Sequence, residues 1–124
     1  MPKAIKITAG QIQVEAELND SPTAKSIFET LPIKAKGYRW GGEIYFSIPV
    51  EAGLEADSRE ILESGELGYW PTGSAFCIFF GTTPASEANE IRAASAVNIV
   101  GSIKSDISQL PDIPDGAIVY IKAD

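Results

Sequence analysis

Apolar and polar residues alternate along most of this chain, and this alternation predicts strands that bury one face and expose the other. In residues 12–18 every second position is apolar and the intervening positions are glutamine or glutamate. Residues 3–8 alternate in the same way before a break at Gly10. Two such runs so close together predict an antiparallel hairpin. Further strands are expected at 33–40, 43–48, 67–70, 75–80, 97–104 and 117–122.

One segment departs from this alternation and has the spacing of a helix. Ser21 is a favourable N-cap residue, and Pro22 suits the first helical position, where its missing N–H has no partner to lose. Four apolar residues then fall on one helical face: Ala24, Ile27, Phe28 and Leu31. Pro32 disfavours the α conformation at the preceding residue. These signals predict one main helix at about 21–31. Weaker signals favour a helical turn near 58–62 and a short helix or turn near 105–110.

The run Phe76–Phe80 is apolar at every position, unlike the other strands. A strand with this pattern is covered on both faces. The pattern as a whole predicts a mostly β protein with eight short strands. Closure of these strands into a barrel would leave no exposed sheet edge. No repeat or linker is visible, so residues 1–124 are expected to form a single domain.

Charge and cysteine content narrow the classes of partner and compartment. The formal net charge is −7, and the ten lysines and arginines are scattered singly rather than grouped into a basic stripe. This pattern disfavours binding to nucleic acid or to an anionic membrane surface. The N-terminal residues lack the long apolar run of a signal peptide, and Cys77 is the only cysteine. These features favour a cytoplasmic protein.

The absence of histidine removes several kinds of chemistry. A chain without histidine cannot build a Ser-His-Asp or Cys-His site from its own residues. Cys77 alone cannot form a cysteine zinc site, and it is expected to be buried and inert. Loop carboxylates at 51–60 and 86–90 lack the spacing of a calcium loop. No metal and no cofactor are therefore expected.

Three blocks of sequence carry a family resemblance: residues 40–50 (WGGEIYFSIPV), 65–84 (GELGYWPTGSAFCIFFGTTP) and 94–101 (ASAVNIVG). In order and spacing they resemble a family of small prokaryotic cyclophilin-like proteins, long described as a domain of unknown function. The resemblance covers nearly the whole chain. It implies a closed eight-stranded cyclophilin-like barrel.

Cyclophilins proper catalyse peptidyl-prolyl cis–trans isomerisation, so the resemblance makes this activity a candidate for the chain. Those enzymes place phenylalanine, histidine and arginine on one strand, and the nearest match here is Tyr38-Arg39-Trp40. Arg39 is the candidate catalytic guanidinium. No histidine exists and no glutamine follows before the next strand, so efficient catalysis is not expected. The alternative role for Arg39 is a solvated strand residue paired with an acidic neighbour.

Aromatic residues near strand ends suggest a groove for a peptide or a small molecule. Trp40 and Trp70 precede turns, where full burial is difficult, and their rings combine large apolar area with a hydrogen-bonding N–H. The candidate groove residues are Tyr38, Trp40, Glu43, Tyr45, Tyr69 and Trp70. We therefore expect a binding protein without efficient catalysis. Two alternatives stay open: a prolyl isomerase with altered residues, and a structural or interaction module in a homo-oligomer. The sequence leaves the oligomeric state and the natural ligand undetermined.

Overall fold

A computed structural model describes residues 2–124 and contains ten strands, one α-helix and two short 3-10 helices. Along the chain the elements are β1 (Lys3–Ala9), β2 (Ile12–Leu18), α1 (Pro22–Thr30), β3 (Ile33–Lys36), β4 (Tyr38–Arg39), β5 (Glu43–Ser47), β6 (Arg59–Leu62), β7 (Glu66–Trp70), η1 (Pro71–Gly73), β8 (Ala75–Phe79), β9 (Ile91–Ile103), η2 (Leu110–Asp112) and β10 (Ile118–Ala123). The chain is mostly β with one main helix, as the alternation predicts.

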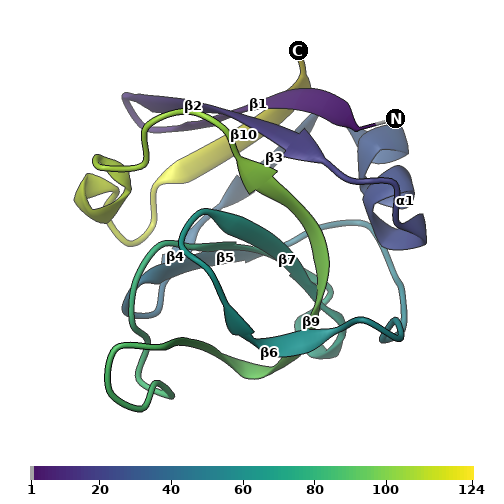
Figure 1. The fold of residues 1–124 in the computed structure, drawn as a ribbon. Coiled ribbons are helices and arrows are strands. Elements are labelled where there is room, and N and C mark those ends of the chain that lie inside the picture. The colour runs from purple at the N-terminus through teal and green to yellow at the C-terminus, as the bar shows by residue number, and fades with distance from the viewer. Residues whose placement is uncertain (1) are drawn as a thin grey trace.

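All ten strands belong to one hydrogen-bonded arrangement of antiparallel pairs. The main path runs β3-β10-β1-β2-β9-β7-β8-β5-β4, and β6 pairs with β9 beside this path. The strands form two layers, one with β1, β2, β10 and β3 and the other with β4, β5, β7 and β8 (Figure 1). The long strand β9 crosses from one layer to the other and pairs with both β2 and β7.

The prediction of a closed barrel with eight strands is wrong in both respects. Two strands are added because residues 33–40 divide at Gly37 into β3 and β4, and residues 58–62 pair with β9 as β6. The sheet path ends at β3 and β4, which are consecutive in the chain and pair with β10 and β5 rather than with each other. The two ends are thus joined by covalent chain and not by a hydrogen-bonded ladder.

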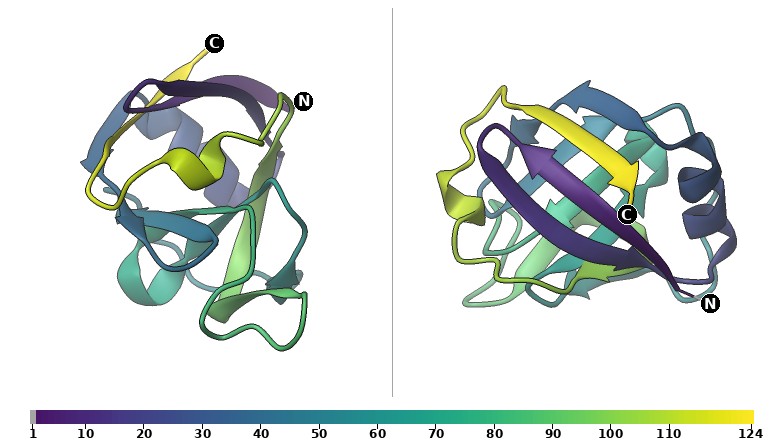
Figure 2. Two further views of the ribbon diagram at one scale, coloured as in Figure 1. Left: turned by 90° about the vertical axis from the view of Figure 1, so that its left-hand side faces the viewer. Right: turned by 90° about the horizontal axis from the view of Figure 1, so that it is seen from above.

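The main core lies between the two layers. The inward-facing residues of β1 and β2 are almost fully buried, and they pack with Phe46 and Phe76, whose rings stack with centroids 5.5 Å apart. Helix α1 lies at one end of this core, and the segment carrying η2 lies at the other (Figure 2). The two ends are therefore covered by different pieces of chain.

Helix α1 begins and ends where the sequence predicts, since Ser21 is its N-cap and Leu31 is its C-cap. The Ser21 hydroxyl accepts a hydrogen bond from the Ala24 N–H. Ala24 and Ile27 are fully buried, whereas Phe28 and Leu31 are only half-buried. The apolar face therefore packs against the core most tightly through its small and β-branched residues.

Two weaker helix predictions have different outcomes. Residues 58–62 are not helical, because pairing with β9 overrides their local preference. Residues 105–110 contain a turn, as one of the two alternatives predicted, and η2 follows at Leu110.

Strand β9 is also longer than predicted and continues through Gly101, where a Cβ would lie 2.0 Å from the Glu17 carbonyl oxygen. Only glycine permits the close approach of β2 and β9 at this point.

Candidate functional site

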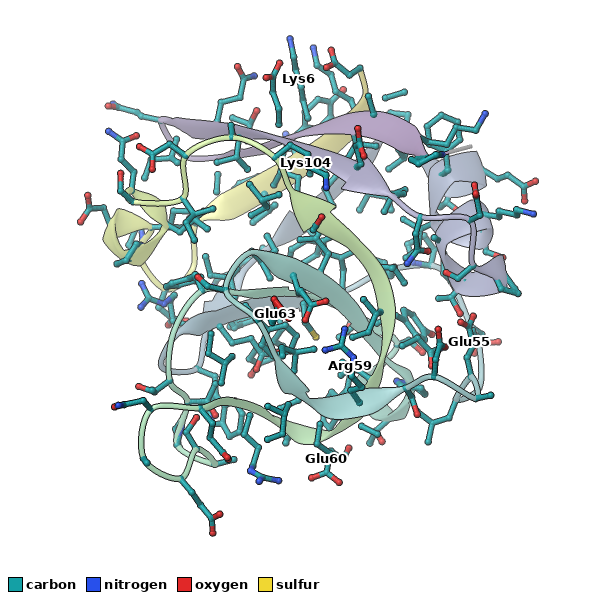
Figure 3. The ribbon with its side chains drawn as sticks, viewed as in Figure 1. Lys6, Glu55, Arg59, Glu60, Glu63 and Lys104 are labelled. Carbon is teal, nitrogen blue, oxygen red and sulfur yellow. The ribbon has the colours of Figure 1, made fainter. Side chains whose placement is uncertain are left out.

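The sheet of β5, β8, β7 and β9 is apolar on both faces, as the sequence of β8 predicts. Its inner face contributes to the main core, and its outer face forms a second, smaller cluster. The buried members of the outer cluster are Leu62, Ala75, Cys77, Phe79, Ala93 and Val97. Strand β6 covers part of this outer face. Figure 3 shows Arg59 and Glu60, neighbours on β6, pointing in opposite directions.

A cavity of about 250 Å³ opens on this outer face. Seven residues line it: Trp40, Glu43, Tyr45, Trp70, Ala93, Ala94 and Val97. Strand alternation explains the grouping, because Glu43 and Tyr45 are two residues apart on β5 and therefore share a face. Tyr45 is registered with Cys77 on β8, which belongs to the same outer face. The cavity thus combines three aromatic residues, three small or aliphatic residues and one carboxyl group.

The turn that carries Trp40 and Glu43 is held firmly in place. Trp40 and Glu43 exchange backbone hydrogen bonds of 2.9 and 3.3 Å, and Gly41 between them has a φ of +60°. The Gly42 N–H donates to the Thr82 carbonyl oxygen at 2.7 Å. A Cβ on Gly42 would lie 2.3 Å from the carbonyl carbon of Gly81, so this contact requires glycine. The turn is consequently fixed against the start of the 81–90 loop.

Trp70 closes another side of the cavity. Its indole N–H donates to the Ser95 hydroxyl at 2.6 Å, which links β7 to β9. A Cβ on Gly73 would lie 3.0 Å from the Trp70 ring, so the 3-10 turn packs closely against the indole. Trp40, Tyr45 and Trp70 are all half-buried. The aromatic rings around the cavity are therefore neither fully enclosed nor free in solvent.

Glu43 is the one ionisable side chain among the lining residues apart from Tyr45, and it is only 6% exposed. Burial raises the pKa of Glu43 to about 7, and a hydrogen bond with the Cys77 thiol opposes that rise. Burial also raises the pKa of Cys77 well above its ordinary value, with the Glu43 charge as a second cause. The carboxyl group therefore titrates near neutral pH, while the thiol stays protonated there. Such perturbed groups in a cleft are typical of functional sites.

Arg39, the candidate catalytic residue, lies outside this cavity and its guanidinium binds backbone carbonyls. Nε and Nη2 donate to the Gly41 oxygen at 3.1 and 2.9 Å, and Nη1 donates to Pro111 and Ile113 at 3.0 and 2.8 Å. The guanidinium also lies 5.1 Å from the centroid of the Phe80 ring. Arg39 thus ties β4 to the η2 segment through backbone acceptors, and not through the acidic side-chain partner of its alternative role.

Two predicted groove residues do not reach the cavity. Tyr69 points to the inner face, where it is fully buried and its hydroxyl donates to the Val50 carbonyl at 2.5 Å. The same hydroxyl accepts a hydrogen bond from the Ala52 N–H at 3.2 Å. Tyr38 is 43% exposed and packs on Tyr45, with ring centroids 5.9 Å apart, but it does not line the cavity. Of the seven predicted residues, the structure brings together Trp40, Glu43, Tyr45 and Trp70.

The first half of β9 contributes to the site without a signal in the sequence. Ala93, Ala94 and Val97 line the cavity although residues 93–96 were not assigned to a strand. Small residues at these positions leave the space that the aromatic rings surround.

Within residues 2–124 no group of three or more potential metal-ligating side chains is found. No helix in the same part of the chain is long and apolar enough to span a membrane.

Comparisons with known proteins agree on the family. The family model described as Cyclophilin-like matches residues 3–122, and the chain belongs to this family. A solved structure with the same fold is the solution structure of a hypothetical protein from Archaeoglobus fulgidus. That protein is 37% identical to this chain with a TM-score of 0.85, and the match covers 99% of this chain and 95% of the other. No curated protein matches the chain. The family is one of uncharacterised function.

Proposed function

We propose that this protein binds a small molecule, or one side chain of a peptide, in the outer-face cavity and does not catalyse prolyl isomerisation efficiently. The observation that carries the proposal is the cavity itself: three aromatic residues around a space of about 250 Å³ with a buried carboxyl group. Ligand sites are typically apolar clefts with a few well-placed polar groups, and drug-sized ligands occupy roughly 300 Å³ or more. A space slightly below that range suits a group the size of an amino-acid side chain.

The state of Arg39 supports binding without isomerase chemistry. A catalytic guanidinium must be available to bind the twisting amide of the substrate. In this chain the guanidinium already donates four hydrogen bonds to the carbonyls of Gly41, Pro111 and Ile113. Recruitment to a substrate would break these bonds and leave those carbonyls without this donor. A protease-coupled assay with a prolyl peptide should therefore show no acceleration above the uncatalysed rate.

Binding is best tested by NMR, with the indole N–H groups as reporters. The chain has two tryptophans, and both line the cavity, so both indole signals report on this site. A titration with small alcohols and capped dipeptides should shift both signals together. Ala94→Phe should abolish the shifts, because residue 94 is exposed on β9 and lines the cavity.

The matched control is Ala4→Phe, at an exposed position of β1 in the other layer of the fold. This variant adds the same ring to an exposed strand position away from the cavity and should leave the shifts unchanged. Shifts confined to residues outside the cavity, or no shift with any compound, would refute the proposed function. A prolyl isomerase turnover that disappears in Arg39→Lys, with the fold retained, would refute the statement about catalysis.

A further inference from the structure

The cavity lining has a charge pattern that favours one chemical class of ligand. Three aromatic residues and one carboxyl group line it, and no lysine or arginine does. Aromatic faces carry negative electrostatic potential and attract cations, most strongly where water is excluded. A carboxylate placed beside such rings adds a full negative charge. A neutral or anionic guest would leave this charge uncompensated.

Among residues 2–124, no basic side chain forms an ion pair with Glu43. The chain has three arginines, and each is engaged elsewhere. Arg39 binds backbone carbonyls, and Arg59 pairs with Glu66 at 2.7 Å. Arg92 pairs with Glu60 at 3.2 Å and also contacts Glu87 and Glu90. The remaining basic residues are lysines, and none of them lines the cavity.

A carboxylate that is only 6% exposed and has no counter-ion is costly, because it has lost most of the water that would solvate its charge. In the part of the chain that the structure describes, the one interaction that lowers the pKa of Glu43 is with the Cys77 thiol, a weak donor that also lies 3.8 Å from the Ala75 carbonyl oxygen. A bound cation would supply the missing compensation. The overall charge of −7 also favours the approach of a positive ligand over a negative one.

Building on the proposed function, we propose that the ligand is an organic ammonium ion, with its cationic head beside Glu43 and its alkyl part among the rings of Trp40, Tyr45 and Trp70. The shared chemistry is an alkylammonium group on an apolar chain. It can come from a free amine or from a lysine side chain of a peptide.

The test compares a cation with its neutral analogue. At pH 8, where Glu43 is ionised, n-butylammonium and n-butanol are titrated separately while the two indole N–H signals are followed. We expect n-butylammonium to bind at least about tenfold more tightly than n-butanol. In Glu43→Gln this preference should fall to near unity, while n-butanol still binds and thereby shows that the cavity is intact.

Each outcome separates this inference from the proposed function. Equal binding of both probes, or a cation preference that survives in Glu43→Gln, would overturn the ammonium assignment and leave a general apolar site. No shift with either probe would overturn the proposed function itself.

A capped lysine amide and its Nε-acetyl form distinguish the two sources of the ammonium group. If the capped lysine binds as well as n-butylammonium and the acetylated form does not, a peptide side chain is the supported source. If only n-butylammonium binds, a free amine is supported.

Discussion

Replacing Glu43 by glutamine should make the protein more stable at neutral and alkaline pH. The carboxyl group is 6% exposed, and its pKa rises from an ordinary value of 4.5 to about 7 on folding. The folded state therefore binds a proton more tightly than the unfolded state does. When the unfolded state binds fewer protons, the free energy of unfolding falls as the pH rises. The stability contributed by protonated Glu43 is fully present below pH 4.5 and is lost as the pH passes through 7.

The size of this effect follows from the pKa values. One pKa unit corresponds to about 1.4 kcal/mol, so a change from 4.5 to about 7 is worth about 3 kcal/mol in total. Between pH 5 and pH 8 the wild-type protein should lose roughly 2 to 3 kcal/mol of unfolding free energy from this group. The three other carboxyl groups with shifted pKa values, Asp20, Glu90 and Asp106, have lowered values and titrate below this range. Cys77 titrates above it.

Urea unfolding at pH 5, 6, 7 and 8 measures the effect directly. Glu43→Gln should show a nearly flat dependence over this range and should exceed the wild type in stability at pH 8. The exposed residue Glu51 supplies the control, because Glu51→Gln removes the same charge from the chain without touching the cavity. Parallel curves for the wild type and Glu43→Gln would refute the assignment of a raised pKa to Glu43.

Three further predictions concern the rest of the fold. Cys77 is 1% exposed and should react with thiol reagents only after unfolding; fast labelling of the native protein would contradict the packing of β8. Arg39→Lys should lower the free energy of unfolding by about 2 kcal/mol in urea titrations, since lysine cannot reproduce the guanidinium's fork of hydrogen bonds to three carbonyls. Phe28→Ala should cost about 2 kcal/mol, less than the 3–5 kcal/mol expected of a fully buried phenylalanine, because its ring is half-buried; a loss above about 4 kcal/mol would show tighter packing.

The sequence predicted the strands and the helix well where one periodicity was unambiguous. Residues 12–18 form β2 with the predicted bounds, and the Ser21–Pro22 signal marks the start of α1. Residues 58–62 were misassigned because their strand has three exposed residues and depends on pairing with β9. Closure of the barrel was predicted wrongly for a similar reason, since it also depends on contacts between distant parts of the chain. The break at Gly37 depends on hydrogen bonds with the 116–117 turn, which lies far away in the chain.

For the candidate site, the alternation of side chains along a strand would have improved the prediction of the groove residues. Tyr69 and Trp70 are adjacent on β7, so their side chains must point to opposite faces of the sheet. Only one of them could belong to an outer-face groove, and the sequence alone does not show which. The hydrogen bonds of the Tyr69 hydroxyl to residues 50 and 52 decide the choice, because they require the ring to point inward. The contribution of Ala93 and Ala94 was invisible for a different reason, since small residues carry no chemical signal by themselves.

The two faces of the β5–β8–β7–β9 sheet differ in how much they contribute to stability. The inner face packs into the main core, whereas the outer face supports a small cluster with an open cavity. Glu43 is expected to lower stability at neutral pH, because burial raises the pKa of its carboxyl group to about 7. By contrast, the buried Asn98 bonds to residues 23, 53 and 55 and joins three segments of chain. A buried polar residue that costs stability and joins no segments is characteristic of a binding site rather than of a structural network. This contrast supports the proposal that Glu43, and not Asn98, serves a binding site.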